Sequence, residues 1–232
     1  MNTKATLVAL GLSAALLGGN AVAATTTLTG TYVSYTFDDA DLGLFGAASL
    51  SGDDLVFAPT NFTAFSADGL PGAAVHTLHI DVSANSGYVL SAITLSESGG
   101  YSLGGGASVF VTGNITALDT EGTTSNQMIG DIVTTAPLDV NGTATSWSAN
   151  AGIVLPASGW GGADGIVNGM GLMITNQLFA TTGPGGTAEV WKNAVNLHVV
   201  TSPVPEAQTY AMLLAGLGLV GLVVRRKRRA EA

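Results

Sequence analysis

The sequence predicts an all-β protein, an antiparallel β-sandwich of the jelly-roll type. Glycine accounts for 32 of the 232 residues, roughly twice its usual share, and strong helix formers are scarce. Apolar residues instead alternate with polar ones, and Gly-rich turn sequences separate the alternating segments. A β-helix is the structural alternative, but no fixed repeat period supports stacked coils, so we rank it second.

The alternation predicts nine or ten short strands. It begins in residues 31–37, where Val33, Tyr35 and Phe37 would share one face, and is clearest in residues 107–118. Gly99-Gly100 is expected to end the strand that starts at Val89. The other expected strands lie at residues 55–57, 76–82, 129–133, 143–149, 170–178 and 190–200.

The charge and the absence of cysteine exclude several kinds of binding site and catalytic group. Between Lys4 and Arg225 the only basic residue is Lys192, against 14 acidic ones from Asp38 to Glu189, so this part has a formal charge of about −13. Such a domain would be repelled by phosphate backbones, which excludes nucleic-acid binding. The chain has no cysteine, which removes disulfides, thiolate metal sites and a thiol nucleophile.

Residues 1–23 have the pattern of a secretory signal peptide. Lys4 supplies the positive charge, residues 7–17 the apolar core, and Ala21 and Ala23 flank a small-residue cleavage site. We therefore expect passage through the Sec export machinery and a mature chain beginning at Ala24. A retained N-terminal anchor is the alternative, and the short apolar core argues against it.

The C-terminus has three parts: a linker at 203–209, an apolar run at 210–224 and a basic tail at 225–232. As a helix, the 15-residue run would reach only about 22 Å, short of the roughly 30 Å hydrocarbon core of a bilayer. The basic cluster should stop transfer and remain in the cytoplasm. Its members are Arg225, Arg226, Lys227, Arg228 and Arg229. Either the run is a plain single-pass anchor, or its glycines allow a partner helix to approach closely.

Val204-Pro205-Glu206, the short Gly/Leu-rich span and the arginine cluster, in that order, resemble the PEP-CTERM sorting signal of Gram-negative bacteria. The family usually has a second proline where this chain has Ala207. The resemblance covers about the last 26 residues. It implies recognition by an exosortase, transient anchoring in the inner membrane, removal of the tail near the motif and delivery to the cell surface, often alongside exopolysaccharide.

Catalytic patterns are sparse. His76 and His79 are three residues apart in a predicted strand, so they face opposite sides and cannot share a metal directly. His76 is expected to be a core histidine with a hydrogen-bond partner, and His198 stands alone. Carboxylates for glycoside hydrolysis could be drawn from several acids, among them Glu97, Asp119 and Glu121, but nothing nominates a pair. We therefore expect no enzyme activity.

Two features suggest binding. Clustered carboxylates on turns suit structural calcium, and the candidates are Asp38, Asp39, Asp41, Asp53 and Asp54. The alternative is a set of solvated turn caps. Trp160, with Asp164 nearby in a Gly-rich loop, could stack on a sugar if its ring is exposed. Alternatively, Trp160 folds back to plug one end of the sandwich, while Trp147 and Trp191 are expected in the core.

Together these features predict a signal peptide at 1–23, a secreted β-sandwich at 24–202 and a sorting signal at 203–232. We expect an exported surface or matrix protein, associated with exopolysaccharide. The alternatives are a secreted hydrolase acting on polysaccharide and a carbohydrate-binding module with structural calcium.

Overall fold

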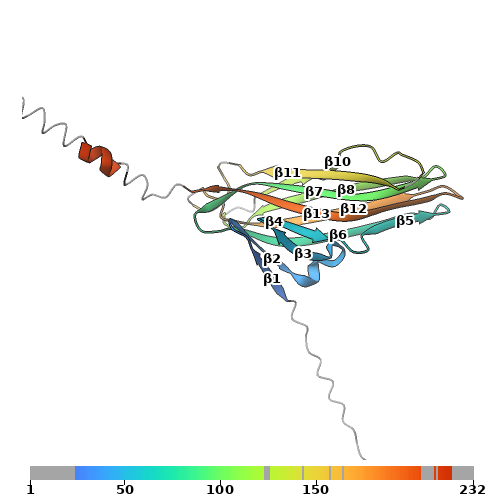
Figure 1. Ribbon diagram of the computed structural model, residues 1–232, viewed down its shortest axis with the longest axis horizontal. Coiled ribbons are helices and arrows are strands. Elements are labelled where there is room, and N and C mark those ends of the chain that lie inside the picture. Colours follow the sequence, from blue (N-terminus) through green and yellow to red (C-terminus); the bar gives the residue numbers. More distant parts are fainter. Residues whose placement is uncertain are drawn as a thin grey trace, which may run out of the picture.

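The computed structural model describes residues 24–122, 126–142, 144–156, 158–163, 165–204, 212 and 214–220. Two antiparallel sheets pack face to face as a sandwich (Figure 1). This confirms the all-β sandwich, while the jelly-roll type stays a prediction.

The first sheet has the strand order β1-β2-β6-β12-β8-β9, and the second β10-β11-β7-β13-β4-β3, with β5 also paired to β13. The first sheet comprises β1 (Thr25–Thr29), β2 (Val33–Asp38), β6 (Gly72–Ala84), β12 (Gly169–Thr181), β8 (Ser108–Asp119) and β9 (Gln127–Asp131). The second comprises β10 (Val133–Thr134), β11 (Thr145–Val154), β7 (Tyr88–Gly104), β13 (Thr187–Pro203), β4 (Asp54–Ala58), β3 (Ala47–Ser51) and β5 (Thr63–Ala67). Two 3₁₀ turns, η1 (Asp39–Asp41) and η2 (Gly43–Phe45), connect β2 to β3.

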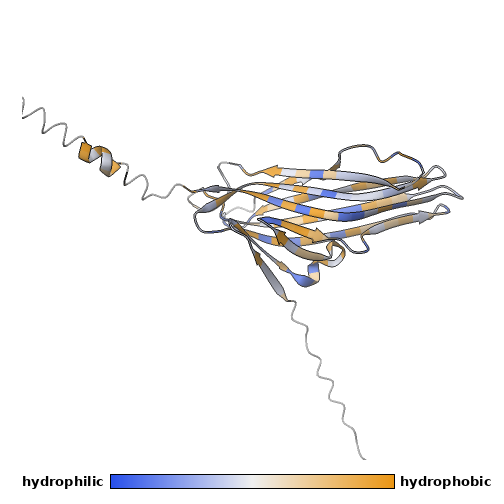
Figure 2. Cartoon of the chain, viewed as in Figure 1, coloured by the Kyte–Doolittle hydropathy of each residue, from blue (hydrophilic) through white to orange (hydrophobic). Residues whose placement is uncertain are grey.

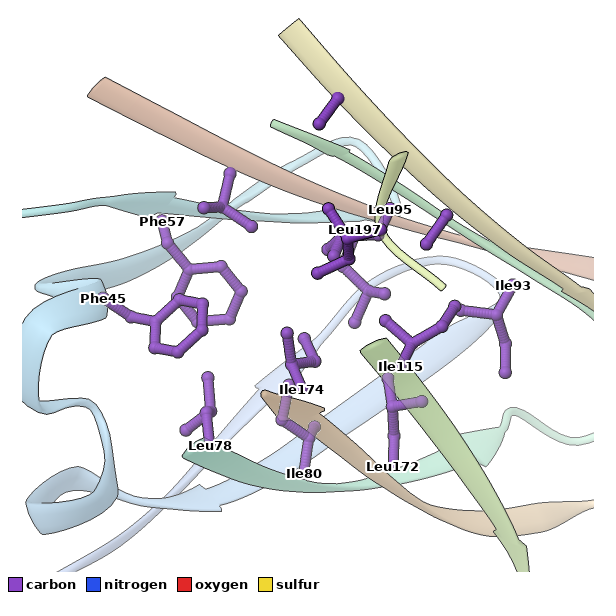
Figure 3. Packing of buried hydrophobic residues seen from close by; sticks show 14 of the residues in the cluster. Phe45, Phe57, Leu78, Ile80, Ile93, Leu95, Ile115, Leu172, Ile174 and Leu197 are labelled. Carbon is purple, nitrogen blue, oxygen red and sulfur yellow. The ribbon is translucent and has the colours of Figure 1, made fainter. Parts of the chain in front are cut away.

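The core lies between the sheets because each strand turns alternate side chains inward. Figure 2 shows apolar residues alternating with more polar ones along the strands. The inner-face prediction for Val33, Tyr35 and Phe37 is confirmed, since all three are buried. Figure 3 shows Leu78, Ile80, Leu172 and Ile174 of the first sheet opposite residues of the second, among them Leu95 and Leu197.

The expected end of a strand at Gly99-Gly100 is wrong: β7 runs through both glycines to Gly104. The two positions need glycine because neighbouring rings lie on their faces. A Cβ on Gly99 would meet the Trp147 ring at 2.8 Å and the Trp191 carbonyl oxygen at 1.9 Å. A Cβ on Gly100 would meet the Trp191 ring at 2.3 Å. Here glycine marks close approach of another segment within a strand.

Three strands lie outside the predicted set, β1, β3 and β5. Their sequences, TTTLT, AASLS and TAFSA, are mostly small or hydroxylated and carry little apolar alternation. The predicted strand at 129–133 is divided between the sheets, with β9 in the first and β10 in the second. Ile132 lies buried at the crossover between them.

β13 is central to the second sheet. It pairs with β7 along almost its whole length, and on its other edge with β5 and then β4. A β-bulge between Lys192 and Ala194 shifts the register by one residue. Lys192 points inward in the alternation set by Ala188 and Val190, and the bulge after it turns Val195 inward in place of Ala194.

Candidate functional site

Three polar side chains meet in the interior of the sandwich. Glu97 comes from β7 and Lys192 from the adjacent β13, whereas Asn176 comes from β12 in the opposite sheet. Their exposed fractions are 3%, 3% and 0%, respectively. Buried Glu and Lys are rare unless they are paired, and here the pairing spans both layers of the fold. We call these three residues the interior cluster.

The interior cluster is a closed ring of hydrogen bonds. The Lys192 Nζ donates to Glu97 Oε2 at 2.5 Å and also to Asn176 Oδ1. The Asn176 Nδ2 donates to Glu97 Oε1 at 2.6 Å. Each carboxylate oxygen therefore has its own donor, and the amide group of Asn176 bonds to both the amine and the carboxylate.

Aromatic rings surround the Lys192 amine. Nζ lies 5.1 Å from the centroid of the Phe62 ring and 5.8 Å from that of Trp147. The Trp147 indole is held in place because its Nε1 donates to the carbonyl oxygens of Gly100 and Trp191. Burial lowers the pKa of Lys192, and the attraction of Glu97 opposes part of that shift.

The sequence offered only a weak signal of the interior cluster. Glu97 is among the acids considered for hydrolysis, and Lys192 stands out as the one cation in a long acidic stretch. A lysine at an inward position of a strand pattern, between Val190 and Val195, would have been a further clue. Asn176, however, is in the opposite sheet, and only the fold brings it to the other two.

The other two carboxylates considered for hydrolysis have structural contacts. Asp119 is buried, and its Oδ1 accepts from the backbone N–H of Glu121 and Gly122, while Oδ2 accepts from that of Gly161. Glu121 Oε2 accepts from the backbone N–H of Asn168 at 2.7 Å. Both acids thus fasten loops at one end of the sandwich.

Four of the five aspartates considered for calcium have local side-chain contacts of their own. Asp38 caps η1 by accepting from the Ala40 N–H, and Asp53 accepts from the Tyr32 N–H. Asp54 accepts from the Asn196 side chain and pairs with His198. Asp39 and Asp41 lie within η1. Among the residues that the structure describes, no three or more His, Asp or Glu side chains are grouped to hold a metal ion, so the structure gives the calcium hypothesis no support.

The histidines behave partly as expected. The expected hydrogen-bond partner of His76 is confirmed, since its Nε2 lies 2.8 Å from the carbonyl oxygen of Asp41, but His76 is half-buried rather than in the core. His79 is exposed, with Nδ1 3.5 Å from an Asp41 carboxylate oxygen. The expectation that His198 stands alone is wrong, because its Nδ1 lies 2.6 Å from Asp54 Oδ1.

Trp160 does not present the exposed ring that sugar stacking requires. It is 6% exposed and belongs to the hydrophobic core, as expected if the loop folds back over the end of the sandwich. Asp164 lies outside the described residues. Of the other two tryptophans, Trp147 is buried in the core as expected, but Trp191 is only half-buried, with its ring over Gly100.

The C-terminal segment follows directly from the sandwich. β13 ends at Pro203, and the Val204 N–H donates to the carbonyl oxygen of Gly87 at 2.8 Å. Pro205, Glu206 and the basic residues 225–229 lie outside the described residues, as do Ala21 and Ala23. Residues 214–220 are helical and exposed. Within the parts that the structure describes, no helix is both long and apolar enough to span a bilayer, and seven residues of the expected anchor at 210–224 fall outside them.

Comparison with known proteins places a PEP-CTERM protein-sorting motif at residues 203–229. No curated protein matches the chain. The matched region begins at the last residue of β13 and includes the linker, the apolar run and the basic cluster. The chain is therefore a β-sandwich protein that carries a PEP-CTERM sorting motif, which implies export, processing by a membrane exosortase and sorting to the cell surface.

Proposed function

We propose that this protein is a non-catalytic component of the cell surface or extracellular matrix, associated with exopolysaccharide. A signal peptide at 1–23 exports it, residues 210–224 hold it transiently in the inner membrane, and the exosortase cleaves near Pro205-Glu206. The observation that carries the proposal is the sorting motif at 203–229, which starts where the last strand of the sandwich ends. Cleavage beyond Pro203 would release a domain with all its strands intact.

The contacts of the acidic residues support a non-catalytic role. A glycoside hydrolase needs two carboxyl groups facing a substrate, one of them as an acid and the other as a base or nucleophile. Here Glu97 is sealed in the interior, whereas Asp119 and Glu121 accept hydrogen bonds from backbone N–H groups of nearby loops. Glu97 and Asp119 are buried, and Glu121, although exposed, holds the backbone of a neighbouring loop.

The outer faces supply groups suited to a hydrated polysaccharide. Pairs of hydroxyl side chains join neighbouring strands at Thr27 and Thr36, Thr77 and Thr175, Ser108 and Thr181, and Thr135 and Ser148. Such hydroxyls both donate and accept hydrogen bonds. Because the domain carries about −13, it would be repelled by a strongly acidic polymer, so we expect a neutral or weakly charged exopolysaccharide.

Processing is tested by the intact mass of the protein recovered from the surface or medium of its own host. The wild type should begin at Ala24 and end near Pro205, while Glu206→Ala should retain its tail and stay in the membrane. Asp139→Ala removes an exposed acid outside the motif and should be processed as the wild type is. A surface form that still carries Arg225 to Arg229 would contradict the proposal.

Polysaccharide association is tested by co-sedimentation of the purified protein with the host's own exopolysaccharide and with an acidic polymer such as alginate. We expect retention by the host polymer and none by alginate, without release of new reducing ends. Reducing ends that disappear when one carboxylate is substituted would instead establish the alternative, a hydrolase.

A further inference from the structure

The interior cluster holds a primary amine, a carboxamide and a carboxylate in one water-excluded place. We propose that Lys192 and Asn176 become joined by an intramolecular isopeptide bond, with Glu97 transferring the protons. The bond would link β13 to β12 and so tie the two sheets of the sandwich together covalently. This inference does not depend on the sorting motif or on polysaccharide binding.

The hydrogen bonds bring the reacting groups together. The Lys192 Nζ hydrogen-bonds to Asn176 Oδ1. Because Oδ1 is bonded directly to Cγ, the amine lies next to this electrophilic carbon. Both groups are on the central strands of their sheets, β13 and β12, and both are fully enclosed. Fixed contact between two reactants replaces a bimolecular encounter by an effectively unimolecular step.

The surroundings favour the reactive form of the amine. Only an unprotonated amine is a nucleophile, and burial lowers the pKa of Lys192 from its usual value. Phe62 and Trp147 flank Nζ and keep water away. Exclusion of water prevents hydrolysis of the amide from competing with attack by the amine.

Glu97 is placed to move both protons. Its Oε2 lies 2.5 Å from Nζ and can take the proton that the ammonium must lose. Its Oε1 lies 2.6 Å from Asn176 Nδ2, the nitrogen that must leave. The neutral amine attacks Cγ, and the new C–N bond forms as electrons move onto Oδ1. Glu97, protonated by the ammonium, delivers that proton to Nδ2 and accepts the second proton from the attacking nitrogen. The old C–N bond breaks, ammonia leaves, and Glu97 is left protonated and neutral.

The reaction balances without an oxidant or a cofactor. One C–N bond forms and one breaks, so the amine and the primary amide become a secondary amide and one molecule of ammonia. The product has lost the positive charge of Lys192 and no longer needs a buried counter-ion. Loss of ammonia to solvent makes the step effectively one-way, since the water-excluded core cannot readily supply a replacement nucleophile.

The position of Lys192 in the sequence allows the isopeptide bond to be tested by trypsin digestion. Between Lys4 and Arg225, Lys192 is the only residue after which trypsin can cut, and the next residue is Asn193. Acylated Lys192 is not a trypsin substrate. The chain purified from its own host, fully unfolded and then treated with trypsin, should therefore remain uncut at Lys192. Tandem mass spectrometry should find Lys192 and Asn176 joined, with a mass lower by one ammonia molecule.

This measurement is valid for the precursor and for the processed protein, because both contain residues 97–192. Its failure is therefore distinct from a failure of sorting. Complete cleavage of unfolded wild-type protein after Lys192 would overturn the proposal. A loss of ammonia with Lys192 still cleavable, as would arise from cyclisation at Asn141-Gly142, would overturn it too.

Variants test the role of each group. Asn176→Ala removes the electrophile, and Glu97→Gln keeps the size of the side chain but cannot accept a proton. Both should restore cleavage after Lys192 and the full mass. Asn196→Ala is the control, because Asn196 is on β13 like Lys192 but hydrogen-bonds to Asp54. It should keep the isopeptide bond. Joined Lys192 and Asn176 in Glu97→Gln would refute the part assigned to Glu97.

Discussion

The C-terminal motif and the interior cluster differ in how far apart their residues lie in the sequence. The motif is contiguous, and its three parts can be recognised in order along residues 203–229. The interior cluster is spread over three strands, and Glu97 and Asn176 are 79 positions apart in the sequence. A motif that an enzyme recognises as a linear segment has to be local in the sequence, whereas chemistry inside a core depends on which strands the fold makes neighbours. The two regions should therefore respond independently to substitution.

The largest effect on stability should follow from Glu97→Ala. The change blocks the proposed reaction and leaves the Lys192 amine buried without a carboxylate partner, and an uncompensated buried charge of this kind costs about 3–5 kcal/mol. We expect a correspondingly lower free energy of unfolding in urea. Glu189→Ala, on the outward face of the neighbouring strand β13, is the control and should change stability by less than about 0.5 kcal/mol.

A triple variant separates the cost of the unpaired buried charge from the stabilisation by the covalent bond. It combines Glu97→Met, Lys192→Met and Asn176→Leu. An apolar replacement of a buried pair is often neutral or stabilising. The triple variant should therefore recover most of the loss, and what it fails to recover is the contribution of the isopeptide bond. A Glu97→Ala variant as stable as the wild type would show that the interior is not the dry environment that the proposed reaction requires.

Much of the fold could be predicted from local pattern. The inward alternation of Val33, Tyr35 and Phe37 follows from residue order alone, and so does the strand that contains Val109 and Ile115. Gly99-Gly100 misled the prediction because glycine marks turns in most sequences, but here it makes room for the rings of Trp147 and Trp191. That requirement comes from strands β11 and β13, which no local window contains.

The site could be predicted only in part for the same reason. The sorting motif is a linear pattern, and the sequence alone indicates it. The aspartates at 38–41 and 53–54 look alike in sequence, yet the structure assigns one to a cap, one to a backbone N–H and one to His198. The ring of Trp160 is buried and belongs to the hydrophobic core, and glycine content alone does not decide between exposure and burial.

The second-largest effect should follow from Trp160→Ala, which separates domain stability from sorting. Removing this buried ring should cost about 3 kcal/mol, seen as a lower urea midpoint. Because Trp160 is covered, retention on exopolysaccharide should persist in the folded fraction. Cleavage near Pro205 should persist as well. Loss of retention at full stability would restore the sugar-stacking hypothesis.

Gly99→Ala should have a smaller effect and tests how closely the strands pack around the interior cluster. Its Cβ would meet the Trp191 carbonyl oxygen and the Trp147 ring, and overpacking of this kind costs about 1–3 kcal/mol. Gly152→Ala is the matched control within a neighbouring strand, since its Cβ would meet nothing closer than 3.7 Å. Equal unfolding midpoints for the two variants would show that β7 can shift to admit the methyl group. In that case the register that brings Glu97 to Lys192 would be looser than the structure indicates.

The smallest effect is expected from a chelator. Asp38, Asp53 and Asp54 each bond to a different group in the protein, whereas calcium requires six or more oxygen ligands converging on one point. Excess EDTA should therefore leave the thermal midpoint of the wild type unchanged, and added calcium should not raise it. Asp38→Ala serves as the comparison, because loss of the η1 cap costs about 1 kcal/mol with or without the chelator. A midpoint that falls in EDTA and recovers with calcium would mean that the acidic turns bind an ion together. The turns at β2 and β4 would then share the property of the interior cluster, a site assembled by the fold from residues distant in sequence.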